Sequence, residues 1–480
     1  MPPYCKECGI SAPEHVDPSQ SNLAEMTTLP DDVLVELFKI YAESDTPLRL
    51  IRVCRRWHAI AAGVSSLWAD ILFYNGPKYD KIEPDWMFDI DPSKKLICYS
   101  PSSLASSIAR VKGNKFELAI VRSQNHKLST EEEWKVLQPS WFSQKCRALR
   151  LCARDSQPLV SHLTDLSALE ELEIYGSVSN SDQASIASLL GTAARTSKLL
   201  RYLRTPNIPS LLDHPSLLGR VAMLHIQLGT TSNAAEITKY VTSATTLTIE
   251  SSAYWIRPSL ECPSPLLDTL VLIGLHWKSL SLSICSKLKH LTIKTGLQST
   301  QTLELPNLTH LTVLEWWMAM LGLQAPKLQI LELKEHYNVN CWDLGTLGEA
   351  DLRPIKLDLD LSVPENTMEP LIRKLWGNIE ELQIVYKVTD GSLWHPLASS
   401  LRGRGESASL CPNLKKLVIL SAKRSTEMQK KSEDLLRGVK DAFNQVGKSI
   451  EVKYGWYEPT VMMEDHDPRD KPIWWTTFTD

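Results

Sequence analysis

The sequence lacks an apolar run long enough to cross a bilayer. Its longest apolar stretch, around residues 316–323, is far shorter than the roughly 20 residues that a membrane-spanning helix needs. The first residues contain no apolar core of the kind found in signal peptides. The sequence therefore predicts a soluble chain in the cytoplasm and/or the nucleus, with no membrane partner.

An excess of charge of one sign is also missing. Lys and Arg together number 52 and Asp and Glu 56, for a formal net charge of -4. Because a balanced chain has no general attraction for polyanions, no nucleic-acid partner is predicted. The ten cysteines are scattered, and some, such as Cys146 and Cys152, lie in apolar, strand-like runs. This distribution is typical of reduced, buried thiols and not of a disulfide framework.

Sequence motifs of catalysis are absent as well. The chain contains no HExxH, GxSxG, GxGxxG or Walker-type motif. Cys5 and Cys8 have the spacing of zinc ligands and His15 lies nearby, but the next cysteine is Cys54, so a four-ligand site is incomplete. Residues 402–405 (RGRG) could hold a phosphate or an acidic partner, although a solvated loop explains them better. The sequence predicts no catalytic residue, no metal site and no cofactor.

Three short amphipathic helices are predicted within residues 29–73. Pro30 suits the first position of a helix, and the two carboxylates that follow it favour the positive end of the helix dipole. A second helix is expected to begin at Pro47, and a third carries Val53 and the residues after it. A Leu-Trp pair closes the segment. A unit of this size rarely folds alone, which indicates a partner or a neighbouring domain.

This segment resembles an F-box. The family pattern LPxxVLxxIF, VCRxW and LW is matched, in order, by LPDDVLVELF, VCRRW and LW. The resemblance implies that the segment binds the Skp-type adaptor of a cullin-based ubiquitin ligase. The residues that it assigns to the adaptor contact are Leu29, Pro30, Val33, Leu34, Leu37, Phe38, Leu50, Val53, Cys54, Trp57, Leu67 and Trp68. Arg55 and Arg56 are expected at a solvated helix edge or at the rim of that contact. The alternative is a small helical domain whose apolar residues form only its own core.

An internal repeat occupies most of the remaining chain. Its pattern is an apolar residue, two variable residues, an apolar residue, one variable residue and another apolar residue. From Val221 to Leu352 the copies start 20 to 24 residues apart. Stacked as parallel strands, such copies share one apolar core that no single copy could form. They start at Cys146, Leu169, Val221, Ala244, Leu267, Leu288, Leu308, Leu328, Leu352, Ile379 and Leu414.

These copies, with Pro-Asn-Leu phrases such as residues 306–308, resemble the leucine-rich repeats of F-box proteins, particularly the divergent sets of mushroom-forming fungi. The predicted fold is α/β: a three-helix F-box followed by an irregular leucine-rich-repeat solenoid of parallel strands stacked in a horseshoe. A helix capped near Ser181 is expected in a widened gap between repeats. The predicted domains are a flexible tail (1–28), the F-box (29–73), a connecting region with weak repeat-like units (74–145), the repeats (146–457) and a tail or cap (458–480).

Target recognition is predicted on the open face of the strands. Its variable positions carry charges of both signs, which favours a protein recognised by shape and local polar pairing. The candidates are Glu173, Tyr175, His225, Glu250, Lys294, Glu332, Lys334, Lys356 and Asp358. Trp316 and Trp317 are either interface anchors or packing residues.

We interpret the chain as a non-enzymatic substrate receptor of an SCF-type ubiquitin ligase. Its predicted partners are a Skp-type adaptor, a cullin and an unknown protein target. Two alternatives stay open: a repeat scaffold that never directs ubiquitination, and an enzyme hidden in the irregular middle of the chain.

Overall fold

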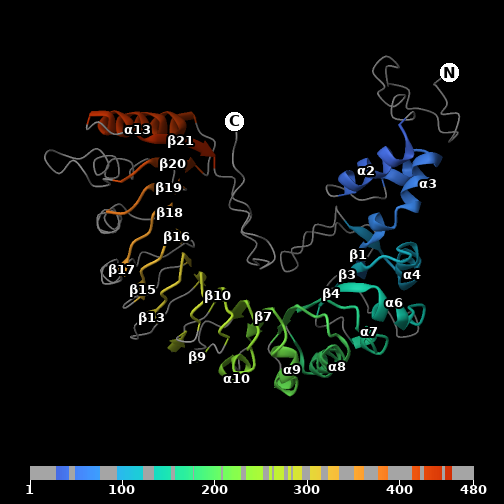
Figure 1. The fold of residues 1–480 in the computed structure, drawn as a ribbon. Coiled ribbons are helices and arrows are strands. Elements are labelled where there is room, and N and C mark those ends of the chain that lie inside the picture. The colour runs from blue at the N-terminus through green and yellow to red at the C-terminus, as the bar shows by residue number, and fades with distance from the viewer. Residues whose placement is uncertain are drawn as a thin grey trace, which may run out of the picture. The chain divides into compact units, whose positions relative to one another are not determined.

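The computed structural model divides the chain into two compact units, the first ending at His214 and the second starting at Pro215 (Figure 1). We refer to them as unit 1 and unit 2 and describe each by itself. The residues that the structure describes are 29–42, 49–75, 95–122, 134–152, 157–176, 178–206, 209–228, 234–251, 259–261, 264–274, 279–282, 285–294, 303–314, 323–334, 351–361, 377–386, 413–421, 426–445 and 449–456.

Unit 1 opens with four short helical elements: α2 (Asp31–Ala42), η2 (Leu50–Arg52), α3 (Arg55–Gly63) and η3 (Ser65–Trp68). Two of the three predicted helices are present as α2 and α3. Where the second was predicted, the described residues hold only the single 3₁₀ turn η2. The reason is local: Cys54 adopts an extended backbone and its thiol accepts a hydrogen bond from the Trp57 amide, so it caps α3 and ends η2.

The sheet of unit 1 has six parallel strands in the order β2-β1-β3-β4-β5-β6. Their bounds are β1 (Asp70–Asn75), β2 (Leu96–Cys98), β3 (Phe116–Arg122), β4 (Cys146–Cys152), β5 (Glu171–Tyr175) and β6 (Tyr202–Pro206). The sheet therefore begins at Asp70, directly after η3, ahead of the first regular repeat at Cys146, and β3 lies in the region where weak repeat-like units were predicted. Three strands, β1, β2 and β3, precede β4 in the chain. The helical segment leads directly into the first of them, β1.

Helices cover one face of this sheet, as Figure 1 shows for α6, α7 and α8. The helical elements between the strands are α4 (Pro101–Arg110), α6 (Pro139–Gln144), α7 (Gln157–Val160), α8 (Asn180–Thr196) and η6 (Pro209–Asp213). The helix predicted near Ser181 is α8, but its cap is Ser179, whose backbone N–H donates to the Asp182 carboxylate at 3.0 Å. Asp182 thus sets the start of the helix two residues earlier than expected.

Within the described residues, the long sheet of unit 2 has ten parallel strands in the order β7-β8-β10-β12-β14-β16-β18-β19-β20-β21. Their bounds are β7 (Met223–Leu228), β8 (Thr246–Ser251), β10 (Thr269–Ile273), β12 (His290–Lys294), β14 (His310–Leu314), β16 (Ile330–Lys334), β18 (Lys356–Leu361), β19 (Glu381–Tyr386), β20 (Lys416–Ser421) and β21 (Glu451–Trp456). The parallel strands predicted from the repeat are thereby confirmed in the described residues. The identity of the repeats as leucine-rich repeats stays a prediction.

The core of unit 2 is a row of leucines at equivalent strand positions. One leucine from each repeat stacks on the next, and each is almost fully buried, so that each contributes roughly 1.5 to 3 kcal/mol. The row consists of Leu224, Leu247, Leu270, Leu291, Leu311, Leu331, Leu357, Leu382 and Leu417.

Short second ladders of strands lie upstream of the long strands in several repeats. They are β9 (Ser259–Glu261) with β11 (Ser279–Ser281), and β13 (Leu303–Glu304) with β15 (Leu323–Ala325) and β17 (Asp351–Leu352). Where the connection is described, a tight turn joins the short strand to the long strand, as between β13 and β14, where the Leu308 amide donates to the Leu305 carbonyl at 3.1 Å. The Pro-Asn-Leu phrase supplies this turn.

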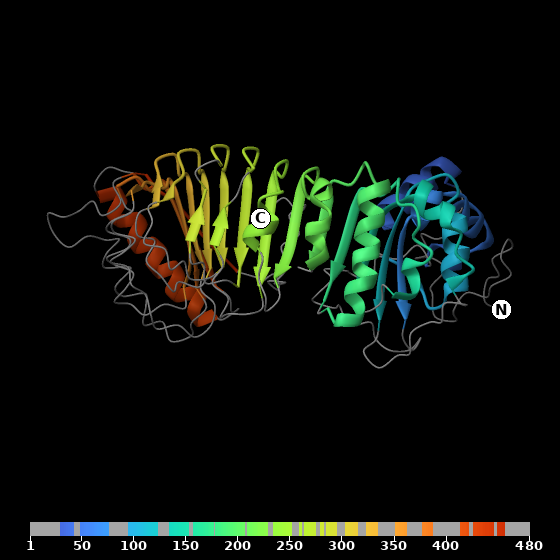
Figure 2. The ribbon, with the colours of Figure 1, turned by 90° about the horizontal axis from the view of Figure 1, so that it is seen from below.

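The helices in the described residues of unit 2 are α9 (Pro215–Leu218), α10 (Ala234–Thr238) and α13 (Thr426–Gln445). α13, drawn in red in Figure 2, lies beside the last strands and buries Leu436 and Phe443. The repeat pattern predicted neither α13 nor β21, because neither carries the Leu-rich signature.

Candidate functional site

The residues predicted to contact an adaptor are divided between the core and the surface. Six are buried inside the chain: Leu34, Phe38, Leu50, Cys54, Leu67 and Trp68. Leu29 and Trp57 are half-buried, and Pro30, Val33, Leu37 and Val53 are exposed. The six buried side chains fill the chain's own core in this structure, and an adaptor contact by them stays a prediction. The four exposed residues are available to a partner.

Helix α2 has two apolar stripes, and only one of them faces inward. Leu34 and Phe38 are buried, and the Phe38 ring packs against Trp57 with 4.8 Å between ring centroids. On the other stripe, Val33, Leu37 and Ile40 are 40, 39 and 63% exposed. We call these three residues the apolar row. Their spacing of four and three residues places them on one face of the helix.

Ile40 was not among the predicted contact residues although it is the most exposed member of the apolar row. The signal was present in the sequence, since Ile40 follows Leu37 by three residues and Val33 by seven. The family pattern ends at Phe38. It includes Leu34 and Phe38 of the inward stripe but not Ile40. Together with Val33 and Leu37, the 63% exposed Ile40 extends the apolar row over two turns of α2, and a contiguous apolar surface of this kind suits a partner.

Arg56 holds the start of α2 against α3. Its guanidinium donates to the Asp31 carboxylate at 2.6 Å and also to the backbone carbonyl of Leu29. Arg55 is exposed, which fits the predicted solvated helix edge or adaptor rim. Arg56 does not fit that prediction, because its guanidinium is hydrogen-bonded within the chain. By fixing the first turn of α2, Arg56 also sets the direction of the apolar row.

Trp68 ties the helical segment to the sheet of unit 1. Its side chain is fully buried, its indole Nε1 donates to the Ala61 carbonyl at 3.0 Å, and the Arg110 guanidinium lies 5.4 Å from the ring centroid. Arg110 belongs to α4, which packs against η3. In this structure Trp68 is a core residue joining three elements, and not a surface contact.

The predicted target-binding residues share one face of the strands, which we call the polar face, but most of them are not open to solvent. Glu173, Tyr175, His225, Glu332 and Asp358 are buried, and Glu250 and Lys356 are half-buried. The side chains of Lys294 and Lys334 lie outside the described residues. The expectation of a freely accessible row of charges is therefore wrong for the five buried residues.

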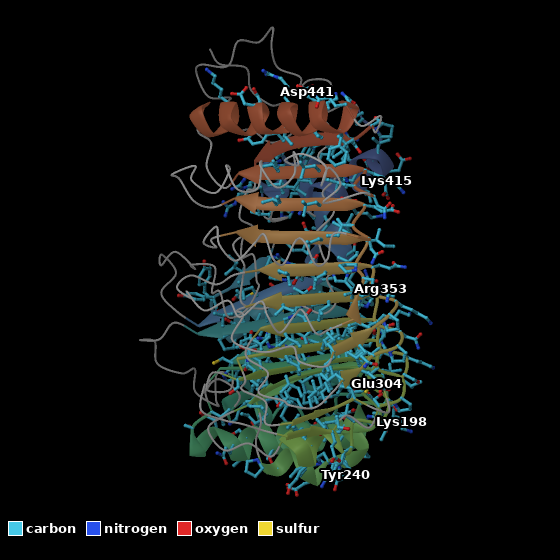
Figure 3. All side chains as sticks on the ribbon, turned by 90° about the vertical axis from the view of Figure 1, so that its left-hand side faces the viewer. Lys198, Tyr240, Glu304, Arg353, Lys415 and Asp441 are labelled. Atoms are coloured by element: carbon cyan, nitrogen blue, oxygen red, sulfur yellow. The ribbon has the colours of Figure 1, made fainter. Side chains whose placement is uncertain are left out.

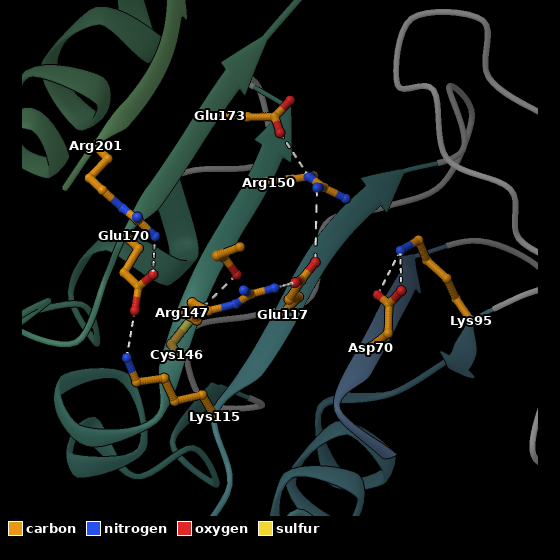
Figure 4. Close-up of polar contacts among 11 residues, drawn as sticks. Asp70, Lys95, Lys115, Glu117, Cys146, Arg147, Arg150, Glu170, Glu173 and Arg201 are labelled. Carbon is orange, nitrogen blue, oxygen red and sulfur yellow. Dashed lines mark hydrogen bonds and ion pairs between the residues drawn. The ribbon is translucent and has the colours of Figure 1, made fainter. Parts of the chain in front are cut away.

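Pairing between neighbouring strands explains how the polar face of unit 1 tolerates burial. In Figure 4, the Arg150 guanidinium lies between two carboxylates, 2.8 Å from Glu173 and 3.9 Å from Glu117. Arg147 makes a further ion pair with Glu117. A buried charge requires such partners, because its desolvation would otherwise cost several kcal/mol. The predicted binding groups are therefore partly engaged with one another.

Polar side chains on the polar face of unit 2 are also paired with one another. His225 Nε2 lies 3.0 Å from Glu250 Oε2, the Thr312 hydroxyl donates to Glu332 at 3.1 Å, and Lys356 lies 3.6 Å from Asp358. The Thr312 and Glu332 pair joins adjacent strands in register, and so does the His225 and Glu250 pair with an offset of two residues. These two contacts between strands stabilise the stacking of the repeats, whereas the Lys356 and Asp358 pair lies within β18.

Two groups of unit 1 have perturbed acidities with clear physical causes. Burial, together with the nearby Glu173 carboxylate, raises the pKa of the Tyr175 phenol well above its ordinary value. Hydrogen bonds from Lys115 and Arg201 outweigh desolvation and lower the pKa of Glu170 (Figure 4). Both shifts keep each group in one protonation state near neutrality, which is typical of a structural role.

Several other predicted sites lie outside the described residues: Cys5, Cys8 and His15, Trp316 and Trp317, and residues 402–405. In the described part of the chain, no group of three or more His, Cys, Asp or Glu side chains is placed to hold a metal ion. Among the described helices, none has both the length and the apolar character to cross a membrane. Cys146 is buried as predicted, whereas Cys152 is half-buried, and neither forms a disulfide within the described residues.

Comparison with known proteins identifies the helical segment. The family model described as F-box-like matches residues 26–74, which end within β1. No curated protein matches the chain. The match confirms the F-box resemblance for this segment, and such a domain indicates a role in binding an adaptor of the SCF type.

Proposed function

We propose that this chain is the substrate-recognition subunit of an SCF-type cullin ubiquitin ligase. In this proposal the F-box-like segment binds a Skp-type adaptor and, through it, a cullin, while the repeats bind a target protein. The chain itself performs no ubiquitin chemistry and acts in the cytoplasm and/or the nucleus. Its contribution is proximity, because holding a target beside the ligase raises the effective concentration of the reacting lysine.

The observation that carries the proposal is the apolar row within the matched F-box-like segment. Val33, Leu37 and Ile40 lie on one face of α2, and their exposed surface has no function in the chain's own core. Val53, 39% exposed, adds a further apolar side chain from the end of η2. Covering each of them contributes roughly 1 kcal/mol, about half of full burial, so the four together supply a few kcal/mol toward association.

The test introduces carboxylates into the apolar row. The variant Val33→Asp/Leu37→Asp should lose capture of a purified Skp-type adaptor by at least about tenfold, because burying two carboxylates at an apolar contact is costly. Leu266→Asp is the matched control: it changes a side chain that is 40% exposed, equal to Val33, in a turn of unit 2. The control should bind the adaptor as the unchanged chain does.

Co-purification then separates a receptor from a scaffold. A receptor should bring down cullin together with the adaptor, and the Asp variant should lose both. Capture of the adaptor without cullin would overturn the ligase assignment. Retained capture by the Asp variant, with an unchanged circular dichroism spectrum, would overturn the role of the apolar row.

A further inference from the structure

Helix α2 is attached to α3 at two points. One is the contact between the Phe38 and Trp57 rings, whose centroids are 4.8 Å apart. The other is Arg56, whose guanidinium donates to the Asp31 carboxylate at 2.6 Å and to the Leu29 carbonyl. We call the contacts of Arg56 with Asp31 and Leu29 the Arg56 clamp. Because Arg56 and Trp57 are neighbours in the first turn of α3, one short segment holds α2 both at its start and further along.

The backbone just before α2 depends on the Arg56 clamp. The Leu34 amide donates to the Pro30 carbonyl at 3.1 Å, as the helix begins. The Leu29 carbonyl lies one residue earlier, outside that pattern, and accepts from Arg56 instead. A backbone carbonyl outside a helix needs a partner from another element, and here α3 supplies it.

The two attachments determine which way the apolar row faces. Val33 lies two residues after Asp31, and Leu37 directly precedes Phe38, so both fall between the attachments. A helix held at one point can tilt and rotate about that point, whereas two points fix its axis and its outward face. Side chains that are already in place lose less entropy when a partner binds them.

We propose that Arg56 is a positioning residue for the adaptor contact. It acts from within the chain, because its side chain is 26% exposed and its guanidinium is bonded to Asp31 and Leu29. Its loss would leave Leu29, Pro30 and Val33 without a fixed place on the surface offered to the adaptor. Naming the partner a Skp-type adaptor rests on the proposed function; the Arg56 clamp itself does not.

A direct contact of Arg56 with the adaptor is the competing explanation. The neighbouring Arg55 is exposed and is the arginine that this turn presents to solvent. An adaptor carboxylate could engage Arg56 only in competition with Asp31. The two explanations also differ in how substitutions combine. Through the clamp, Asp31 acts by way of Arg56, whereas two separate contacts with the adaptor would add their free energies.

The experiment measures adaptor affinity by biolayer interferometry, with the full chain and a purified Skp-type adaptor. Arg56→Ala should weaken capture about fivefold to tenfold, in the range of one charge-assisted hydrogen bond. Asp31→Ala should weaken it about twofold to threefold, because an exposed ion pair is weak. The double variant Asp31→Ala/Arg56→Ala should match Arg56→Ala, since Asp31 then lacks the group through which it acts.

Rescue and control variants accompany these measurements. Arg56→Lys keeps the charge and one donor direction, and should lose only about twofold to threefold. Arg55→Ala and Asp32→Ala remove the same charges from neighbouring exposed positions and should stay within about twofold. Lys415, labelled at the edge of the sheet of unit 2 in Figure 3, forms an exposed ion pair with Glu380 at 2.7 Å. Lys415→Ala removes that pair and should leave capture unchanged.

Hydrogen exchange measures the Arg56 clamp without any adaptor. In Arg56→Ala, the amides of the first turn of α2, beginning with Leu34, should exchange at least about fivefold faster, while those of α3 and of the sheet of unit 1 stay unchanged. Tm should fall by no more than about 4 °C, because the clamp lies at an exposed helix start. A residue with only a structural role would instead lower the stability of the whole unit.

The outcomes keep this inference and the proposed function apart. If the chain captures the adaptor and Arg56→Ala captures it equally well, the inference is overturned and the proposed function stands. The same holds if the losses of Asp31→Ala and Arg56→Ala multiply in the double variant. If the unchanged chain captures no adaptor, the proposed function falls and the adaptor role of Arg56 falls with it, whereas unchanged exchange in Arg56→Ala would refute the clamp itself.

Discussion

Replacing Trp68 distinguishes a core residue from a surface contact, and so tests how the F-box-like segment is built. Trp68 is fully buried, donates to the Ala61 carbonyl and lies beneath Arg110. If Trp68 acts as a core residue through this packing, Trp68→Ala should destabilise unit 1 as a whole. If Trp68 instead met the adaptor directly, the substitution should weaken capture and leave stability unchanged.

The expected magnitude follows from three losses. Truncating a buried tryptophan costs about 3 to 5 kcal/mol, and the loss of the donor to Ala61 favours the upper part of that range. The cation–π contact with Arg110, an exposed residue, adds about 0.5 to 1 kcal/mol. For a unit ending at His214, the total of about 3.5 to 6 kcal/mol corresponds to a fall in Tm of roughly 7 to 24 °C. Trp68→Phe keeps most of the apolar area and should cost about 1 to 3 kcal/mol.

Thermal melts followed by near-ultraviolet circular dichroism, run in parallel with adaptor capture well below the melting range, decide between the two roles. Trp68→Ala should lower Tm and keep appreciable capture in the cold, whereas Ile40→Asp should abolish capture at an unchanged Tm. Arg110→Gln, which removes only the cation, should lower Tm slightly. The reasoning is refuted by a Trp68→Ala chain that melts normally and captures no adaptor.

Two further predictions concern charge and backbone geometry. Because Lys115 lies 2.5 Å from Glu170 and lowers its pKa, Glu170→Gln should destabilise unit 1 by about 1 kcal/mol at pH 7. The difference should vanish as pH falls below about 4.3 and through the lowered native pKa, because the unfolded chain then takes up the proton first; urea melts at pH 7 and pH 3 measure it. Gly274, with φ of +71°, should not tolerate alanine: Gly274→Ala would drive its Cβ into the Ser251 carbonyl and cost more than about 2 kcal/mol, whereas Gly113→Ala meets nothing and should cost less than about 1 kcal/mol in the same melts.

The strands could be predicted because the same apolar pattern recurs in every copy of the repeat. Each copy places two apolar residues two positions apart, and stacking sets every copy in the register of its neighbours, so an error in one copy is corrected by the others. Strands that lack this apolar pattern were not predicted. β21 carries Val452 where the other strands have leucine, and it is aligned with Leu417 of β20 by tertiary pairing and not by its own pattern.

The F-box-like segment could be recognised but not divided into core and surface. Val33 and Leu34 are adjacent, equally apolar and both part of the family pattern, yet one is 40% exposed and the other is fully buried. Which of the two side chains is buried depends on the position of Trp57 in α3. That position cannot be inferred from the sequence of α2 alone. A recognised motif therefore names a set of residues without stating which of them face the partner.

The polar face shows why an alternating strand pattern does not by itself identify a binding surface. The position of Glu332 predicts a side chain pointing away from the leucine row, and the structure agrees, but whether that side chain meets solvent depends on the adjacent strand. Thr312 stands directly opposite it in register and donates to its carboxylate, and His310 lies 3.3 Å away. Such a group can bind a partner only by giving up contacts that stabilise the stack.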